Sequence, residues 1–163
     1  MPVDERASPM ILTSVLAACG GFLLAVLWMD LMFDVQVLRY RGREVPEDIL
    51  ASIAAYYRRV TTDARPMSHL IGAVMLIALG GSAAELLSHQ LPTWAAAASV
   101  LLVGGPVLLA ATRVYPNAVR LATRADTPPL QSALAWSICR EHLLCVVGVL
   151  AFLAIQVSAL WRG

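Results

Sequence analysis

The stretch MILTSVLAACGGFLLAVLWM, residues 10–29, decides the fold, because it runs for twenty residues without a charged side chain. At about 1.5 Å of rise per residue, an α-helix of this length matches a bilayer core roughly 30 Å thick. A helix on the surface of a soluble protein carries polar residues on one face instead. The sequence therefore predicts a membrane-spanning helix over residues 10–31.

Three further apolar stretches predict spanning helices over residues 69–88, 91–113 and 134–160. Of the 163 residues, 59% are hydrophobic and the mean hydropathy is +0.71, well above the range of soluble domains. The apolar runs are continuous rather than alternating, which excludes a strand barrel. No polar stretch is long enough to fold separately. We therefore expect an all-α integral membrane four-helix bundle, with residues 1–163 forming a single transmembrane domain.

The connection between the first two spans carries a helical pattern of its own, over residues 46–60. Pro46 suits a first helical position, and Glu47 and Asp48 follow it at the positive end of the helix dipole. Apolar and aromatic residues then recur on one face, and arginines stand at the far end: Ile49, Ile53, Tyr56 or Tyr57, Val60, Arg58 and Arg59. This pattern predicts a short amphipathic helix in the membrane interface. It would serve either as an anchor or as a lid over a site.

Arginine distribution predicts the orientation, since positively charged loops stay on the cytoplasmic side. The first and third connections hold most of the twelve basic residues, all of them Arg, whereas the second connection holds none: Arg39, Arg41, Arg43, Arg58, Arg59, Arg65, Arg113, Arg120 and Arg124. We expect these two connections in the cytoplasm and both termini on the outer side of the cell (inner) membrane. The net charge of +1 gives no basic face for nucleic acid.

Glycines predict where the helices approach one another. Pairs fall near the middle of the first three spans and a single glycine lies in the fourth: Gly20, Gly21, Gly80, Gly81, Gly104, Gly105 and Gly148. Small residues allow close contact between membrane helices. Pro106 follows one pair and predicts a kink in the third span.

Polar residues gather at the cytoplasmic ends of all four spans. Two of them, Asp30 and Asp34, are one turn apart and share a helix face. The layer as a whole contains Asp30, Asp34, His69, Arg113, Tyr115, Asn117, Arg120, Arg140, Glu141 and His142. The outer half offers only Glu85, His89 and Gln156. Ionisable groups within a span are costly and usually face the bundle interior in pairs.

Three interpretations of this layer stay open. The first is a structural ion-pair network of Asp30 and Asp34 with Arg113 and Arg140. The second is a metal site for iron, copper, manganese or zinc, with Asp30, Asp34, His69, Glu141 and His142 as the available ligand types. The third is a metal-free pocket. In it a carboxylate or histidine acts as general base on a lipophilic substrate, and an arginine holds an anionic oxygen.

Several short motifs carry a resemblance to a known family. They are Tyr56-Tyr57-Arg58-Arg59, then Arg113-x-x-x-Asn117-x-x-x-Leu121, then Trp136-x-x-x-Arg140-Glu141-His142. With their order along the chain, they resemble the anthrone-oxygenase-like family of small four-helix membrane proteins. The resemblance implies oxygen insertion into an electron-rich polycyclic phenol without an obvious bound cofactor. It makes His142, Arg140 and Asn117 the catalytic candidates.

The functional expectation is therefore an oxidoreductase or oxygenase that acts on a lipophilic aromatic or quinone-like substrate. The alternative is a non-catalytic small subunit or assembly factor of a larger membrane complex. The expected partners are the lipid bilayer, a lipophilic small molecule, and another membrane protein or a second copy of this chain.

Overall fold

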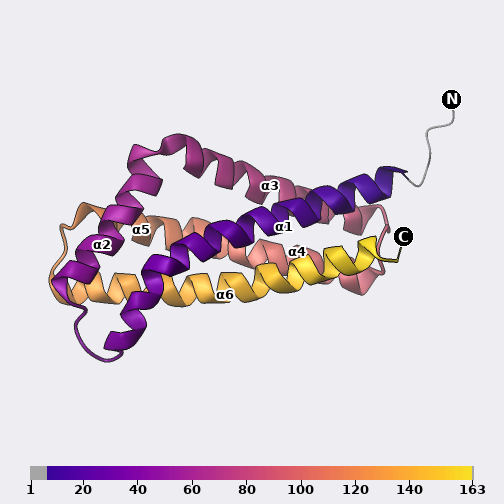
Figure 1. Cartoon of the computed structure of the whole chain (residues 1–163). Coiled ribbons are helices and arrows are strands. Elements are labelled where there is room, and N and C mark those ends of the chain that lie inside the picture. The colour runs from indigo at the N-terminus through magenta and orange to yellow at the C-terminus, as the bar shows by residue number, and fades with distance from the viewer. Residues whose placement is uncertain (1–6, 163) are drawn as a thin grey trace.

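The computed structural model describes residues 7–162, which form helices joined by short connections, with no strand in that range (Figure 1). Four helical stretches are long and apolar enough to cross a membrane: Met10–Tyr40, Pro66–Leu87, Thr93–Thr123 and Pro128–Leu160. The prediction of an all-α bundle with four spans is confirmed.

The elements follow one another in a simple order. The long helices are α1 (Ala7–Asp34), α3 (Arg65–Leu87), α4 (Thr93–Leu109) and α6 (Pro128–Leu160). The short ones are α2 (Glu47–Arg58) and α5 (Tyr115–Thr123). A 3-10 helix, Val35–Tyr40, extends α1, and π-helical turns at Arg59–Asp63 and Ala110–Val114 precede α3 and α5.

Helix α1 lies along α6, while α3 contacts α1 and α4 (Figure 1). Helix α2 lies at the end of the bundle opposite the N-terminal end of α1 and the C-terminal end of α6. There it packs against α5 and α6. Helix α3 leans away from α6 toward the α2 end, as Figure 1 shows. The bundle is therefore wider at the α2 end than at the other.

The spans run longer than the hydropathy pattern predicts. The third continues beyond residue 113 through the Ala110–Val114 π turn into α5, and the fourth begins at Pro128 rather than at residue 134. Pro116 has no backbone N–H, so an ordinary α-helix would lose one hydrogen bond here. The π turn directly before it lets the helix pass this proline, and Pro66 likewise follows the π turn at Arg59–Asp63.

Close approach at glycine is confirmed for three of the expected positions. A β-carbon on Gly81 would lie 2.7 Å from a methyl of Leu16, and one on Gly20 would lie 3.3 Å from the Phe152 ring. One on Gly148 would lie 3.0 Å from the Leu102 carbonyl oxygen. Gly21, Gly80 and Gly105 have no such neighbour within 4 Å. One glycine of each of the first two pairs thus faces a neighbouring helix, and its partner does not.

Candidate functional site

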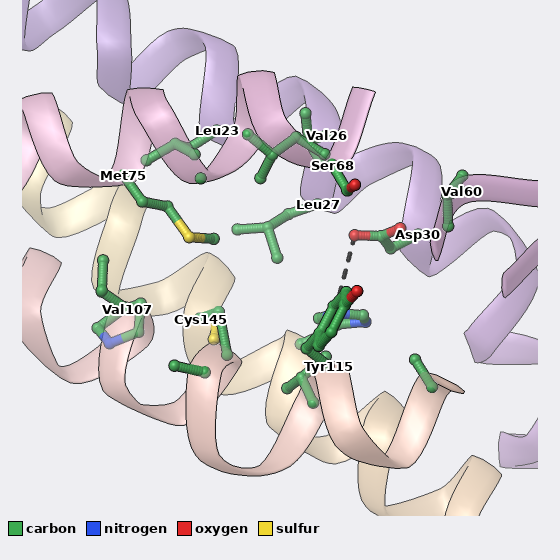
Figure 2. A pocket seen from close by; sticks show the side chains of 18 of the residues that line it. Leu23, Val26, Leu27, Asp30, Val60, Ser68, Met75, Val107, Tyr115 and Cys145 are labelled. Carbon is green, nitrogen blue, oxygen red and sulfur yellow. Dashed lines mark ion pairs between the residues drawn. The ribbon is translucent and has the colours of Figure 1, made fainter. Parts of the chain in front are cut away.

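A cluster of acidic, aromatic and imidazole side chains lies at the α2 end of the bundle. Asp30 and Asp34 come from the last turns of α1, Tyr56 and Tyr57 from α2, and His142 from the middle of α6. His142 Nδ1 lies 2.6 Å from Asp34 Oδ2, a hydrogen-bond distance within a buried pair. His142 Nε2 lies 3.7 Å from Asp30 Oδ2, and the dashed line in Figure 2 marks this pair. The imidazole is therefore held between two carboxylates.

The two tyrosines complete the hydrogen bonds of the carboxylates. Tyr57 Oη donates to Asp34 Oδ1 and Tyr56 Oη donates to Asp30 Oδ1, both at 2.7 Å. Burial, with the nearby carboxylates adding to it, raises the pKa of both phenols above the ordinary tyrosine value. Each phenol therefore keeps its proton and acts as a donor to its aspartate.

Helix α2 reaches the cluster because one of its faces is buried. Leu50, Ile53, Ala54 and Tyr57 recur at helical spacing and are all buried. Tyr56 stacks on the Phe33 ring of α1, with ring centroids 4.2 Å apart. Packing of α2 thus fixes both hydroxyl groups against the end of α1.

No arginine that the structure describes forms an ion pair with these aspartates. Arg113 lies 3.7 Å from Glu141, and its side chain is 61% exposed. Arg140 is exposed. The basic side chain that contacts Asp30 and Asp34 is His142, so the expected pairing with Arg113 and Arg140 is not what the structure shows.

A cavity of about 590 Å³ opens beside the cluster. Figure 2 shows Leu27 between Asp30 on one side and Met75 on the other. The lining comes from α1, α2, α3, α4, α5 and α6 and from the two π turns. Its polar members are few: Asp30, Tyr56, Tyr57, Thr61, Ser68, Tyr115, His142 and Cys145. Large apolar cavities with a few convergent polar groups are typical of small-molecule sites.

The structure brings together only part of the predicted site. His142 and Asp30 line the cavity, and Asp34 is fully buried behind them. Arg140 is exposed and Asn117 is half-buried, and neither lines the cavity. His142 is therefore the one catalytic candidate from the sequence that reaches the cavity.

The candidate metal ligands do not form one set. His69 is exposed, and Glu141 accepts a hydrogen bond from Ser137 at 2.9 Å and faces Arg113 instead of the two aspartates. Within residues 7–162, no group of three or more His, Cys, Asp or Glu side chains is placed to hold a metal ion. Asp30, Asp34 and His142 act on one another through hydrogen bonds and charge.

Tyr56 and Tyr57 belong to the cluster, although the sequence pattern placed them only on a helix face and in a family motif. The helical pattern of residues 46–60 placed either Tyr56 or Tyr57 on the apolar face of α2, and Tyr57 is the one buried there. It did not show that their hydroxyls would meet Asp30 and Asp34, because the register of α2 against α1 depends on the packing of Phe33 and Tyr56.

A second buried polar cluster lies at the opposite end of the bundle. Glu85 of α3 accepts hydrogen bonds from Thr13 Oγ1 at 3.0 Å and from Gln156 Nε2 at 3.1 Å. The same Gln156 nitrogen donates to Ser99 of α4 at 3.2 Å. Each of the four long helices thus contributes one buried side chain. The expectation of a plain outer half missed this network, because Thr and Ser are unremarkable within apolar spans.

Replacing Glu85 by alanine should lower the free energy of unfolding by about 1–3 kcal/mol, because Thr13 and Gln156 would lose their shared acceptor in a buried site. Unfolding in detergent or bicelles, followed by circular dichroism, measures the change. Glu85→Gln keeps an acceptor oxygen and should therefore lower the free energy of unfolding by less. Equal stability of Glu85→Ala and of the exposed-site control Glu44→Ala would contradict a stabilising network.

Comparisons of the chain with protein-family models, with curated proteins and with solved structures gave no match. The function is therefore inferred from the residues and their geometry.

Proposed function

We propose that this protein binds a lipophilic aromatic molecule in the cavity beside α2 and uses His142 as a general base on it. The observation that carries the proposal is the 2.6 Å contact between His142 Nδ1 and Asp34, at the wall of a largely apolar cavity. When Nδ1 carries a proton and donates a hydrogen bond to Asp34, Nε2 is the unprotonated nitrogen that can accept a proton. A positioned base of this kind contributes about 10²- to 10⁴-fold to a rate.

The proposed reaction is the oxidation of an acidic aromatic CH₂ group by dioxygen, which the resemblance to anthrone-oxygenase-like proteins suggests. His142 Nε2 takes one proton of the CH₂ group, and the C–H electron pair passes into the ring system. The resulting carbanion reduces O₂ and forms a C–O bond, giving a peroxide anion at that carbon. The His142 imidazolium returns its proton to this anion, which gives a hydroperoxide and regenerates the base. Loss of water then leaves a carbonyl, so that CH₂ and O₂ become C=O and H₂O.

The surroundings of His142 support proton transfer in two ways. Asp34 fixes the ring orientation and stabilises the imidazolium that forms, and Tyr57 in turn holds Asp34 at 2.7 Å. The apolar lining excludes water, which strengthens the electrostatic interactions inside. Arg140 and Asn117 lie outside the lining, so the proposal gives them no contact with substrate.

The proposal also includes the setting of the cavity in the cell membrane. With the Arg-rich connections on the cytoplasmic side, α2 lies in the cytoplasmic interface as an amphipathic helix, and the cavity lies in the cytoplasmic half. Its exposed apolar rim, formed by Met29, Met67 and Leu76, then faces the lipid, from which a lipophilic substrate enters.

The test uses the full chain in lipid nanodiscs with a panel of anthrones and hydroquinones. Oxygen uptake and formation of the carbonyl product are the readouts. We expect His142→Gln to reduce turnover by about 10²-fold or more. The control Arg140→Gln should stay near the wild-type rate, since Arg140 is exposed.

Turnover unaffected by His142→Gln would overturn the assignment of the base. An inactive wild-type protein that co-purifies with a larger membrane complex would support the alternative of a non-catalytic subunit.

A further inference from the structure

Charge is distributed unevenly around the cavity. Its lining includes Asp30 and His142, and no Lys or Arg is among the described lining residues. Asp34 lies directly behind His142, so two carboxylates share one imidazole. When both carboxylates are ionised, the imidazole balances at most one of their two negative charges, and no described side chain of the lining balances the other.

The described arginines close to the lining residues along the chain are exposed or paired with other acids. Arg58, Arg59 and Arg140 are exposed. Arg113 pairs with Glu141, Arg120 with Asp126 and Arg124 with Glu47. None of the arginines that the structure describes lines the cavity. An anionic ligand would meet the Asp30 carboxylate inside an apolar wall, where like charges repel more strongly than in water.

The remaining polar lining suits a cation. Tyr56, Tyr57 and Tyr115 all contribute to the wall, and aromatic rings attract cations at their faces. A volume of about 590 Å³ holds a ligand of several fused rings. An apolar rim exposed to lipid admits molecules that concentrate in the membrane, as lipophilic amines do.

We propose that this cavity binds lipophilic organic cations, with Asp30 as the counter-ion of a protonated amine attached to an aromatic ring system. The proposal rests on the same cavity as the proposed function but not on its chemistry. The ammonium group lies against Asp30 Oδ2, while Tyr56 keeps its hydrogen bond to Oδ1. The ring system occupies the apolar part near Leu27 and Met75 (Figure 2).

The test compares three fluorescent probes that share one ring system: 1-aminomethylpyrene, 1-pyrenemethanol and 1-pyrenecarboxylate. Each is titrated into nanodiscs of phosphatidylcholine that hold the full chain, and empty nanodiscs correct for partition into lipid. We expect the amine to bind at least about tenfold more tightly than the alcohol, and the carboxylate more weakly than both.

Variants show whether Asp30 sets this order. Asp30→Asn keeps an acceptor for Tyr56 but removes the charge, and it should bring the amine and alcohol affinities within about twofold of each other. Asp48→Asn, which removes an exposed acid of α2, should leave the tenfold preference intact. Wild-type protein that binds all three probes equally, or that prefers the carboxylate, overturns the proposal. So does an Asp30→Asn variant that keeps the preference.

The two proposals fail separately. His142→Gln should reduce turnover by about 10²-fold or more while the amine still binds, because Asp30 keeps its charge. If the wild-type protein takes up oxygen with substrate but does not prefer the amine probe, the cation-site proposal alone is overturned. If the amine binds but no substrate is turned over, the proposed oxidation alone is overturned.

Discussion

Asp34→Ala should destabilise the protein by about 3–5 kcal/mol, the loss expected when one partner of a buried ion pair is removed. Asp34 is fully buried and accepts hydrogen bonds from Tyr57 at 2.7 Å and from His142 at 2.6 Å. Its removal leaves a buried phenol and a buried imidazole without their shared acceptor. Unfolding by sodium dodecyl sulfate in mixed micelles measures the change in free energy.

The matched variant Asp34→Asn separates charge from hydrogen bonding. An asparagine oxygen can still accept from one of the two donors, so its loss of stability should lie well below that of Asp34→Ala. Asp48→Ala, at an exposed position of α2, should change stability by less than about 0.5 kcal/mol. If Asp34→Ala and Asp48→Ala unfold alike, the cluster does not hold α1, α2 and α6 together.

Gly148→Val should be the most disruptive substitution among the glycines. A β-carbon at this position would lie 3.0 Å from the Leu102 carbonyl oxygen and 3.0 Å from Pro106 Cγ. Neither group can move away without shifting the backbone of α4. Overpacking of this kind typically costs about 1–3 kcal/mol, and the valine methyls add to the clash. The same unfolding assay measures the loss.

Gly105→Val is the natural control, because a β-carbon there meets no heavy atom within 4 Å. It should leave stability nearly unchanged. Gly148 adjoins Val149, which lines the cavity, so Gly148→Val should also weaken the binding of pyrene probes. A Gly148→Val protein as stable as Gly105→Val would show that α4 and α6 do not approach here as closely as the structure indicates.

The four spans could be predicted because long uncharged runs have one stable solution in a bilayer, the helix. The inward face of each helix was harder to predict. Arg140 and His142 are two residues apart, which places them about 200° apart around α6. Because His142 faces the cavity, Arg140 must point away from it. A helical wheel of α6 predicts this once His142 is assigned to the inward face.

The positions of Asn117 and Tyr57 relative to the cavity depend on contacts that hydropathy does not encode. Asn117 lies outside the cavity lining, whereas Tyr115 and Ala118 of the same helix line it. Likewise, the packing of α2 that brings Tyr57 to Asp34 joins residues 23 positions apart. Such contacts depend on three-dimensional register rather than on composition.

The contact between Asp34 and His142 joins residues 108 positions apart, and this separation bears on how the protein is made. During synthesis, α1 enters the membrane long before α6 has been translated. Its two carboxylates must wait near the interface without their imidazole partner until the last helix arrives. The site is thus complete only after α6 has been made, and a chain cut short before His142 would leave both carboxylates without their imidazole partner.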